Sequence, residues 1–316
     1  MSFFNQFPKV YPLANGCYES MKILLTGASG FLGEHIFNEL SKNHKVDTFG
    51  RKPTDTYISD LTALNIKIKN QYDLTIHTMG LAHKTPKSEI ENEAFFKINV
   101  EGTRNFLNTV INKTKSFVFI SSVAVYGRSR GLKIDETVSL LGGGAYADSK
   151  IRAENLVLEW GQKNDVNISI LRLPLIVGEN PKGNLLLMKN AIKSGRYFRV
   201  GKGDAKKSMV LAEDIAKIIP LLVNKGGIFN LTDGYHPSFM ELEDVLAKKE
   251  SKVIRSIPHL MAKIGAFPGD LFKFWPLSTQ KLNKITSSLT FDDNKARKEL
   301  GWKPMPVLDW LRNNNI

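Results

Sequence analysis

Short apolar runs alternate with stretches of helical periodicity through the first half of the chain. Residues 22–26 form an apolar run that ends at Gly27, and apolar side chains then recur at helical spacing through residues 31–42. Further apolar runs cover residues 46–49, 74–78, 117–121 and 168–173, with helical patterns such as 99–112 and 150–163 between them. This alternation predicts an α/β fold with a parallel, doubly wound sheet.

The pattern changes beyond Pro174. Loops dominate there, with helical patterns near residues 185–193 and from Ala212 onward, a strand pattern at 228–231, and a C-terminal region rich in Pro, Phe and Trp. We therefore expect a sheet domain over residues 21–174 and a smaller lobe formed mainly by residues 175–316, with some segments that return to the sheet. No internal repeat or linker separates the two halves in the sequence.

Residues 1–20 are expected to be an N-terminal extension. They contain no unbroken apolar run, so they match neither a signal peptide nor a membrane span, and Met21 is an alternative start. The single cysteine, Cys17, lies in this extension, and the six histidines include no pair at i, i+4. These counts argue against a disulfide framework and a metal site, and they favour a reducing, cytoplasmic compartment.

The formal net charge of the 316 residues is +13, with lysines spread along the chain. Such a charge suits an anionic cofactor and substrate, although a solvated, lysine-rich surface accounts for it as well. The sequence contains no RNP-like or helix-turn-helix pattern, so we expect no nucleic-acid partner. A homodimer is one of the oligomeric states that the sequence leaves open.

Glycines punctuate the junction between the first strand and the first helix, in the run Gly27-Ala28-Ser29-Gly30-Phe31-Leu32-Gly33. In this context glycines allow a tight turn, a close approach of the backbone to a pyrophosphate and close packing of helix on strand, while the positive helix N-terminus faces the phosphates. The spacing alone is weak evidence, but the strand-turn-helix context predicts a dinucleotide site in a Rossmann-type domain.

The end of the second strand bears on the choice of cofactor. An acidic residue there binds the ribose diol of NAD, whereas a basic residue accommodates the 2′-phosphate of NADP. Asp47 lies too early, within the strand, and the strand ends in Gly50-Arg51-Lys52. The sequence therefore favours NADP(H), with Arg51 on the 2′-phosphate, and leaves NAD(H) as the alternative.

Three side chains form a candidate catalytic set. The strand at 117–121 continues into Ser121-Ser122-Val123-Ala124-Val125-Tyr126-Gly127, and Tyr146 and Lys150 follow four residues apart, on one face of a helix. A nearby lysine favours the phenolate and so lowers the pKa of the phenol, which allows proton exchange with a hydroxyl or carbonyl near neutral pH. A serine hydroxyl can polarise the same oxygen. These residues predict hydride chemistry assisted by an acid/base tyrosine.

With these motifs the chain resembles, from Met21 almost to its C-terminus, the extended short-chain dehydrogenases/reductases, that is, the NAD-dependent epimerase/dehydratase family. The resemblance implies that Tyr146 is the acid/base, that Lys150 lowers its pKa and binds the ribose, and that Ser122 matches the catalytic Ser or Thr and touches the substrate. Asn99 matches a residue that orders the catalytic face, although a helix N-cap explains it equally well. The implied cofactor contacts are Gly27, Ser29, Gly30, Phe31, Leu32, Gly33, Arg51, Asp60, Leu61, Asn99, Tyr146, Lys150 and Pro174.

The second half resembles the UDP-glucose 4-epimerase-like branch, which includes UDP-sugar 4-ketoreductases of surface-polysaccharide synthesis. The runs 171–178 and 182–185 carry this likeness, and the asparagine that matches Asn184 lies near the nucleotide diphosphate in that branch. Lys207 stands where the family usually has a diphosphate-binding arginine. Because lysine lacks the bidentate fork, this departure weakens the expected phosphate contact. The implied partner is a nucleotide-diphosphate sugar.

Two departures from the motifs of related enzymes reduce the number of reactions that the chain is expected to catalyse. Val123-Ala124 stands where the resembled 4,6-dehydratases have Asp-Glu, and the only cysteine is far from the other motifs, which disfavours dehydration and epimerisation at neighbouring carbons. We expect 4-keto reduction of a UDP- or dTDP-sugar, with a UDP-sugar 4-epimerase that holds NAD tightly as the alternative. A non-catalytic NADP-binding regulator of the same fold is disfavoured, because Tyr146 and Lys150 are both present.

Residues 257–277 are dense in aromatic and aliphatic side chains with interspersed lysines. Such a composition is found in patches that meet anionic lipid. Pro258, Pro268 and Pro276 are expected to break up any long amphipathic helix there. We therefore assign the segment to closure of the substrate lobe and expect no stable membrane insertion.

Overall fold

A computed structural model describes residues 20–62, 66–82, 86, 88–271 and 278–314, without the side chains of residues 268–271 and 280. The expected extension with Cys17 lies outside the described residues, apart from Ser20. Met21 is buried at the start of the first strand.

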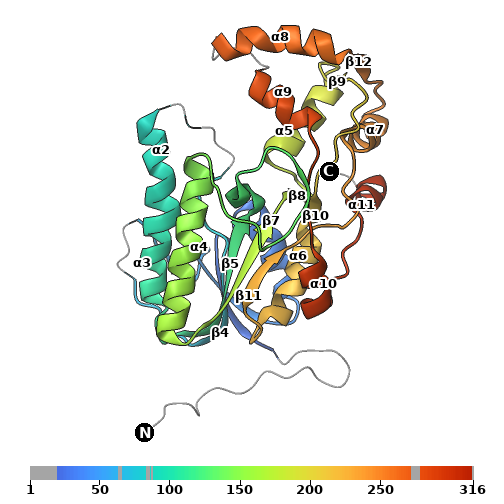
Figure 1. Ribbon diagram of the computed structural model, residues 1–316. Coiled ribbons are helices and arrows are strands. Elements are labelled where there is room, and N and C mark those ends of the chain that lie inside the picture. The colour runs from blue at the N-terminus through green and yellow to red at the C-terminus, as the bar shows by residue number, and fades with distance from the viewer. Residues whose placement is uncertain (1–19, 63–65, 83–85, 87, 272–277, 315–316) are drawn as a thin grey trace.

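Seven parallel strands form one sheet in the order β11-β7-β5-β4-β1-β2-β3 (Figure 1). Their bounds are β1 Lys22–Thr26, β2 Lys45–Gly50, β3 Tyr57–Ile58, β4 Tyr72–His77, β5 Thr114–Ser122, β7 Asn167–Leu173 and β11 Gly227–Asn230. The order reverses between β1 and β4, which places a crevice at the carboxyl ends of these two strands. The predicted doubly wound, parallel α/β fold is confirmed.

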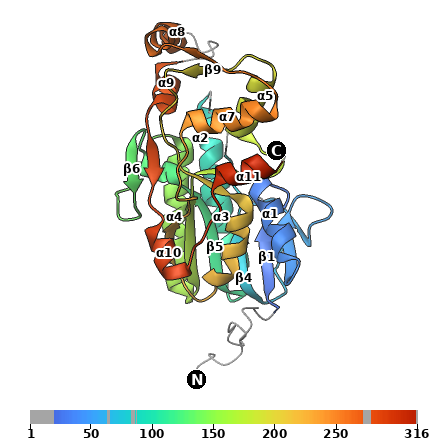
Figure 2. The ribbon, with the colours of Figure 1, turned by 90° about the vertical axis from the view of Figure 1, so that its right-hand side faces the viewer.

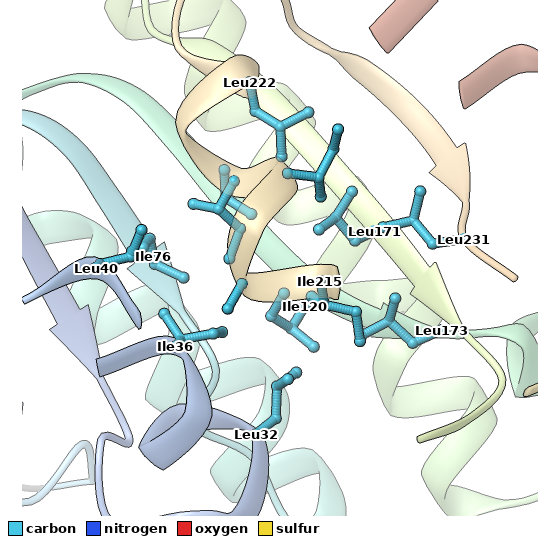
Figure 3. Packing of buried hydrophobic residues seen from close by; sticks show 14 of the residues in the cluster. Leu32, Ile36, Leu40, Ile76, Ile120, Leu171, Leu173, Ile215, Leu222 and Leu231 are labelled. Atoms are coloured by element: carbon cyan, nitrogen blue, oxygen red, sulfur yellow. The ribbon is translucent and has the colours of Figure 1, made fainter. Parts of the chain in front are cut away.

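Helices cover both faces of this sheet. On one face lie α2 Glu89–Phe96, α3 Gly102–Thr109 and α4 Ala145–Asn164, and on the other α1 Phe31–Leu40 packs on α6 Ala212–Ile218 (Figures 1 and 2). Figure 3 shows the second face, where Leu32, Ile36 and Leu40 of α1, spaced at i, i+4 and i+8, meet strand residues such as Ile120 and Leu171. This spacing is the core-facing stripe of an amphipathic helix.

Two helical segments differ from the sequence prediction. The helix expected over 99–112 starts ten residues earlier, because α2, the π-helical turn Lys97–Glu101 and α3 follow one another directly. The helix expected from Lys150 begins at Ala145, after three glycines, 142–144, all with positive φ. Both starts were missed because their first turns are largely polar and small, which leaves little apolar periodicity to detect.

The remaining elements build a smaller lobe at the carboxyl end of the sheet (Figures 1 and 2). Its strand pairs are β8 Leu175–Val177 with β10 Met209–Leu211, β9 Phe198–Val200 with β12 Arg255–Ile257, and β6 Gly131–Ile134 with β13 Leu289–Phe291. Its helices are α5 Gly183–Lys193, α7 Phe239–Lys249, α8 His259–Leu271, α9 Thr279–Thr286 and α11 Val307–Asn313. Helix α10 Asn294–Leu300 and the 3₁₀ turn Ile219–Leu222 pack in the core of the sheet domain, and a second 3₁₀ turn, Val123–Tyr126, follows β5. The two halves share chain segments, since β11 and α6 belong to the sheet domain.

The expectation that prolines break up a helix in residues 257–277 is wrong for its first part. Helix α8 runs from His259 to Leu271, and the amide of Ala262 donates to the Pro258 carbonyl. Pro258 therefore stands at the helix start, where its missing N–H leaves no bond unmade. Residues 272–277 of the segment lie outside the described residues.

Candidate functional site

The glycine turn after β1 is built for close approach. Gly27 has a φ of +73°, and a Cβ there would lie 2.5 Å from the Thr78 hydroxyl oxygen, while a Cβ on Gly33 would overlap the Gly27 carbonyl. Gly30 caps α1, its amide bonded to the Gly27 carbonyl at 2.9 Å. Phe31, Leu32 and Gly33 form the first turn of α1, and Ser29 is exposed before it. The turn places the N-terminus of α1 at the crevice, as a pyrophosphate site requires.

The loop after β4 forms the other wall of this crevice and was missed by the sequence argument. A Cβ on Gly80 would lie 3.0 Å from the Asn99 amide oxygen and 3.6 Å from Lys150 Nζ. Asn99 is buried and accepts from the Leu81 amide at 2.6 Å, and its amide nitrogen donates to the Ser149 hydroxyl at 2.9 Å. Asn99 therefore ties this loop to α4 and is no helix N-cap, since it lies inside the π-helical turn. A glycine after a strand at the topological switch point was the available signal.

The end of β2 carries charges of both signs. Arg51 forms an ion pair of 3.6 Å with Asp60, both side chains largely in solvent. The Thr62 amide and hydroxyl donate to Asp60, and these bonds keep the pKa of that carboxyl below its usual value. Leu61 is buried, and Asn105 donates to its carbonyl at 3.0 Å.

Two aspartates near β2 have different positions. The Asp47 carboxylate is buried within the strand and accepts from the Tyr72 hydroxyl at 2.7 Å and from Asn70 at 3.1 Å, so it is occupied by the core. Asp55 lies against the strand end, because a Cβ on Gly50 would overlap its carboxylate, which accepts from the Lys52 amide at 2.8 Å. Asp55 was not predicted from the sequence, since only folding of the loop brings it to Gly50.

Ser122 and Tyr146 meet where β5 ends beside the first turn of α4. Ser122 is the last residue of β5 and accepts from the Ala124 amide at 3.2 Å. Tyr146 is the second residue of α4, and its phenol lies near the Ser122 hydroxyl, which acts to lower the pKa of the phenol. One turn further along α4, Lys150 is buried; its ammonium donates to the Ile120 carbonyl at 2.7 Å and lies over the Phe119 ring. The three residues of the predicted catalytic set thus lie close together near the carboxyl end of β5.

The pKa of the Tyr146 phenol differs from the value expected from the sequence. Burial raises the pKa of the Tyr146 phenol above its ordinary value, and the nearby Ser122 hydroxyl offsets only part of that effect. Burial also lowers the pKa of Lys150 to about 8, although the Glu154 carboxylate works in the opposite direction. The groups of the protein itself therefore do not produce the expected lowering of the tyrosine pKa, because desolvation of the phenol has the larger effect. Tyr146 is therefore a protonated phenol at neutral pH.

A buried network of polar side chains connects α4, which carries Tyr146 and Lys150, to the neighbouring strands. Glu154 of α4 forms an ion pair of 2.7 Å with Arg172 of β7 and accepts from the Ser121 hydroxyl at 2.5 Å. Arg172 donates to the Tyr126 hydroxyl at 3.2 Å, and Tyr126 in turn donates to Asn230 of β11 at 2.8 Å. Because the network joins three neighbouring strands to α4, it fixes the end of β5 relative to the tyrosine helix.

Pro174 and the residues expected to bind the substrate, Asn184 and Lys207, lie on the side of the sheet domain that carries the lobe. Pro174 separates β7 from β8, Asn184 is exposed in the first turn of α5, and Lys207 precedes β10. Burial, and then the charge of Lys284 on α9, lowers the pKa of Lys207 to about 8. Two ammonium groups that lie near each other repel, and an anion bound beside them would relieve this repulsion. Lys284 was not predicted as a site residue from the sequence.

Comparison with known families decides the class of the chain. The profile of the NAD dependent epimerase/dehydratase family matches residues 23–232, which include the glycine turn, Ser122, Tyr146 and Lys150. The chain belongs to this family. It is an NAD(P)-dependent enzyme of the extended short-chain dehydrogenase/reductase type, and the family membership predicted from the sequence is confirmed.

Individual relatives are distant but extend over most of the chain. An N-acetyl-alpha-D-glucosaminyl-diphospho-ditrans,octacis-undecaprenol 4-epimerase of Escherichia coli O157:H7 is 26% identical over 296 residues, which are 87% of this chain and 88% of the relative. The structure of RMD from Pseudomonas aeruginosa complexed with NADPH has a TM-score of 0.72 at 21% identity and covers 92% of this chain and 97% of its own. MoeE5 in complex with UDP-glucose and NAD has a TM-score of 0.72 at 19% identity, covering 92% and 96%.

Proposed function

We propose that the protein is a cytoplasmic enzyme that uses NADPH to reduce the 4-keto group of a UDP- or dTDP-linked sugar for polysaccharide biosynthesis. The observation that carries this proposal is the geometry of the set. Tyr146 lies in the first turn of α4 and Ser122 at the end of β5, and the buried ammonium of Lys150 follows one helical turn after the tyrosine. Reduction of a ketone needs an acid that protonates the oxygen, whereas oxidation of an alcohol needs a base. A protonated tyrosine matches the reductive direction.

In this mechanism each residue of the set has one task. A bound NADPH would supply the hydride for the carbonyl carbon. The Tyr146 hydroxyl donates its proton to the oxygen of the same carbonyl, so that the ketone becomes a secondary alcohol. The Ser122 hydroxyl holds that oxygen in line and polarises it. Lys150, anchored on the Ile120 carbonyl at 2.7 Å, would bind the ribose of the cofactor, and its charge would stabilise the phenolate that remains.

The lobe offers recognition of the sugar carrier. Lys207 and Lys284 form a cationic pair whose mutual repulsion a diphosphate would relieve. Asn184, exposed at the start of α5, would donate its amide to the same group. Val123 and Ala124 form the turn after Ser122, and they provide no acid or base for dehydration.

A UDP-sugar 4-epimerase with bound NAD is the second candidate. Asp55 favours it, because a carboxylate at the end of β2 is suited to the ribose diol of NAD and repels a 2′-phosphate. The Escherichia coli relative is also a 4-epimerase, of a sugar carried on undecaprenol diphosphate. A lipid diphosphate is therefore a third carrier to include in any substrate test, beside UDP and dTDP.

A substrate panel separates the two candidates. UDP- and dTDP-4-keto sugars are mixed with the enzyme and NADPH, and cofactor oxidation is followed at the nicotinamide absorbance band. A reductase consumes one NADPH for each sugar reduced. Interconversion of UDP-sugars without added cofactor, and with NAD released on denaturation of the purified enzyme, would replace the reductase proposal by the epimerase.

The cofactor choice has its own test at Arg51 and Asp55. If Arg51 meets the 2′-phosphate, Arg51→Ala should weaken NADPH binding by about tenfold or more, as loss of a charge-assisted bond of about 1.5–3 kcal/mol does, and should leave NADH binding nearly unchanged. Asp55→Asn should tighten NADPH binding, since it removes a like charge. Calorimetry that finds NADH binding more tightly than NADPH to the wild type overturns the NADP assignment.

A further inference from the structure

Helix α8 carries large apolar side chains on its solvent side. Leu260, Met261, Ile264 and Phe267 are each between 62% and 70% exposed, and we call these four residues the outer face of α8. Leu260, Ile264 and Phe267 follow the i, i+4, i+7 spacing of one helical stripe, with Met261 at its side. Single exposed apolar residues are common on protein surfaces, whereas a stripe of this kind marks an interaction site.

The inward side of α8 is made of small residues. Ala262 and Ala266 are buried and pack with Leu282 of α9, next to Val200 and Ile257. An ordinary surface helix turns its large apolar residues inward and its polar residues outward. In α8 the larger apolar surface faces solvent, so contact with the lobe does not explain why these side chains are apolar.

The sequence that flanks the outer face is strongly basic. Residues 251–286 contain six basic residues, Lys252, Arg255, Lys263, Lys273, Lys281 and Lys284, and one acidic residue, Asp270. Lys263 is an exposed residue of α8 itself. An apolar stripe bordered by lysines, whose long aliphatic stems lie on apolar surface while the ammonium reaches the headgroups, is the pattern of an interfacial helix.

We propose that α8 docks the enzyme on an anionic lipid bilayer, with its outer face among the acyl chains just below the headgroups. This inference concerns the location of the enzyme and does not depend on the proposed reaction. The charge of the region selects lipid over a protein partner of neutral surface, because each basic residue near an anionic bilayer contributes to attraction.

The place of α8 in the molecule is compatible with such docking. It lies at the outer end of the lobe, on α9 and away from the sheet (Figures 1 and 2). Its 13 residues span about 20 Å at 1.5 Å per residue, which suits a helix lying flat in the interface. Within the described ranges no helix is long and apolar enough to cross a bilayer. The proposed contact is peripheral, and it adds to the packing of α8 on the lobe, where Ala262 and Ala266 lie against Leu282.

Vesicle co-sedimentation tests the proposal with the full chain. Vesicles of phosphatidylglycerol and phosphatidylethanolamine are compared with vesicles of phosphatidylcholine alone, at low and at high salt. We expect the wild type to sediment with the anionic vesicles at low salt and much less with either neutral vesicles or high salt, because headgroup attraction is screened. Absence of sedimentation with anionic vesicles at low salt overturns the proposal.

Variants assign the binding to α8. The double variant Ile264→Glu/Phe267→Glu should lower the vesicle partition coefficient by about tenfold or more, since two apolar side chains leave the interface and two like charges enter. Lys263→Ala should lower it by about fivefold. The matched control is Ile90→Glu on α2, an isoleucine that is 78% exposed in another helix, which should bind as the wild type does. Circular dichroism and thermal melting confirm that each variant is folded.

Size-exclusion chromatography excludes the competing occupant, a second copy of the chain. The proposal predicts the same oligomeric state for the wild type and the double variant. If the double variant dissociates a wild-type oligomer and vesicle binding is unchanged, the outer face is a protein interface and the lipid proposal is wrong. Equal vesicle binding by the wild type, the double variant and Lys263→Ala overturns it as well.

Discussion

At the scale of single residues, Lys150 is an ammonium placed where water is nearly excluded. Its Nζ has the Ile120 carbonyl as a hydrogen-bond partner and the Phe119 ring beneath it, and burial lowers its pKa from 10.5 to about 8. Keeping this charge buried costs stability, which is tolerated because the charge serves the site.

The pH dependence of unfolding should report this cost. Between pH 8 and 10.5 the unfolded chain holds a proton on Lys150 that the folded protein has lost, so the free energy of unfolding contributed by this residue rises with pH across that window. Lys150→Met should remove the rise, so the free energy of unfolding of the wild type should increase with pH relative to that of the variant. Lys298→Met, at an exposed lysine of α10, is the control. Denaturant titrations measure both. A difference that stays constant from pH 8 to 10.5 contradicts the assignment.

The sequence allowed some residues of the site to be predicted and not others. Ser122, Tyr146 and Lys150 were found because their spacing along one strand end and one helix encodes their proximity. Asp55 and Lys284 were not found. Asp55 lies against Gly50 only when its loop folds back, and Lys284, whose charge acts on Lys207, belongs to an element far away in the chain. The direction of the tyrosine pKa was also missed, because the degree of burial of a phenol cannot be deduced from a motif.

At the scale of elements, the Glu154–Arg172 pair locks α4 to β7. Both side chains are almost fully buried, at 1% and 4% exposure, and the pair also holds Ser121. The position of α4 decides the position of Tyr146, so this ion pair fixes catalytic geometry from a distance.

Removal of one partner should therefore be costly. Glu154→Ala leaves the Arg172 guanidinium buried without its carboxylate, and we expect a loss of about 3–5 kcal/mol in the free energy of unfolding. Glu101→Ala breaks an exposed pair with Arg104 on neighbouring turns and should cost less than about 1 kcal/mol. Chemical denaturation of the two variants checks the contrast, and equal losses would show that the buried pair does not hold the elements together.

Element prediction succeeded where apolar residues are periodic. Strands β1, β4, β5 and β7 and helix α1 carry continuous or regularly spaced apolar side chains, and the sequence indicated each of them. The short β3 and the polar α2 were missed, since two residues and a charged first turn leave no period to detect. Helix α8 was misjudged because Pro258 stands at its start.

At the scale of the whole molecule, the enzyme presents two functional ends. In the proposed function the hydride chemistry takes place at the carboxyl ends of β1 and β4, and Lys207 and Lys284 of the lobe would bind the sugar carrier. Helix α8 lies at the outer end of the same lobe (Figure 1). Docking of α8 would keep the carrier-binding lobe at the membrane surface while the sheet domain remains in water.

The turnover of Tyr146→Phe with NADPH and the 4-keto sugar that the panel identifies is the most direct test of the account. The substitution removes only the hydroxyl that donates the proton, so the fold and the dissociation constant for NADPH should be unchanged. The rate of NADPH oxidation should fall by about 10²–10⁴. A rate within a few-fold of the wild type would contradict the role of Tyr146 as the acid and with it the proposed mechanism.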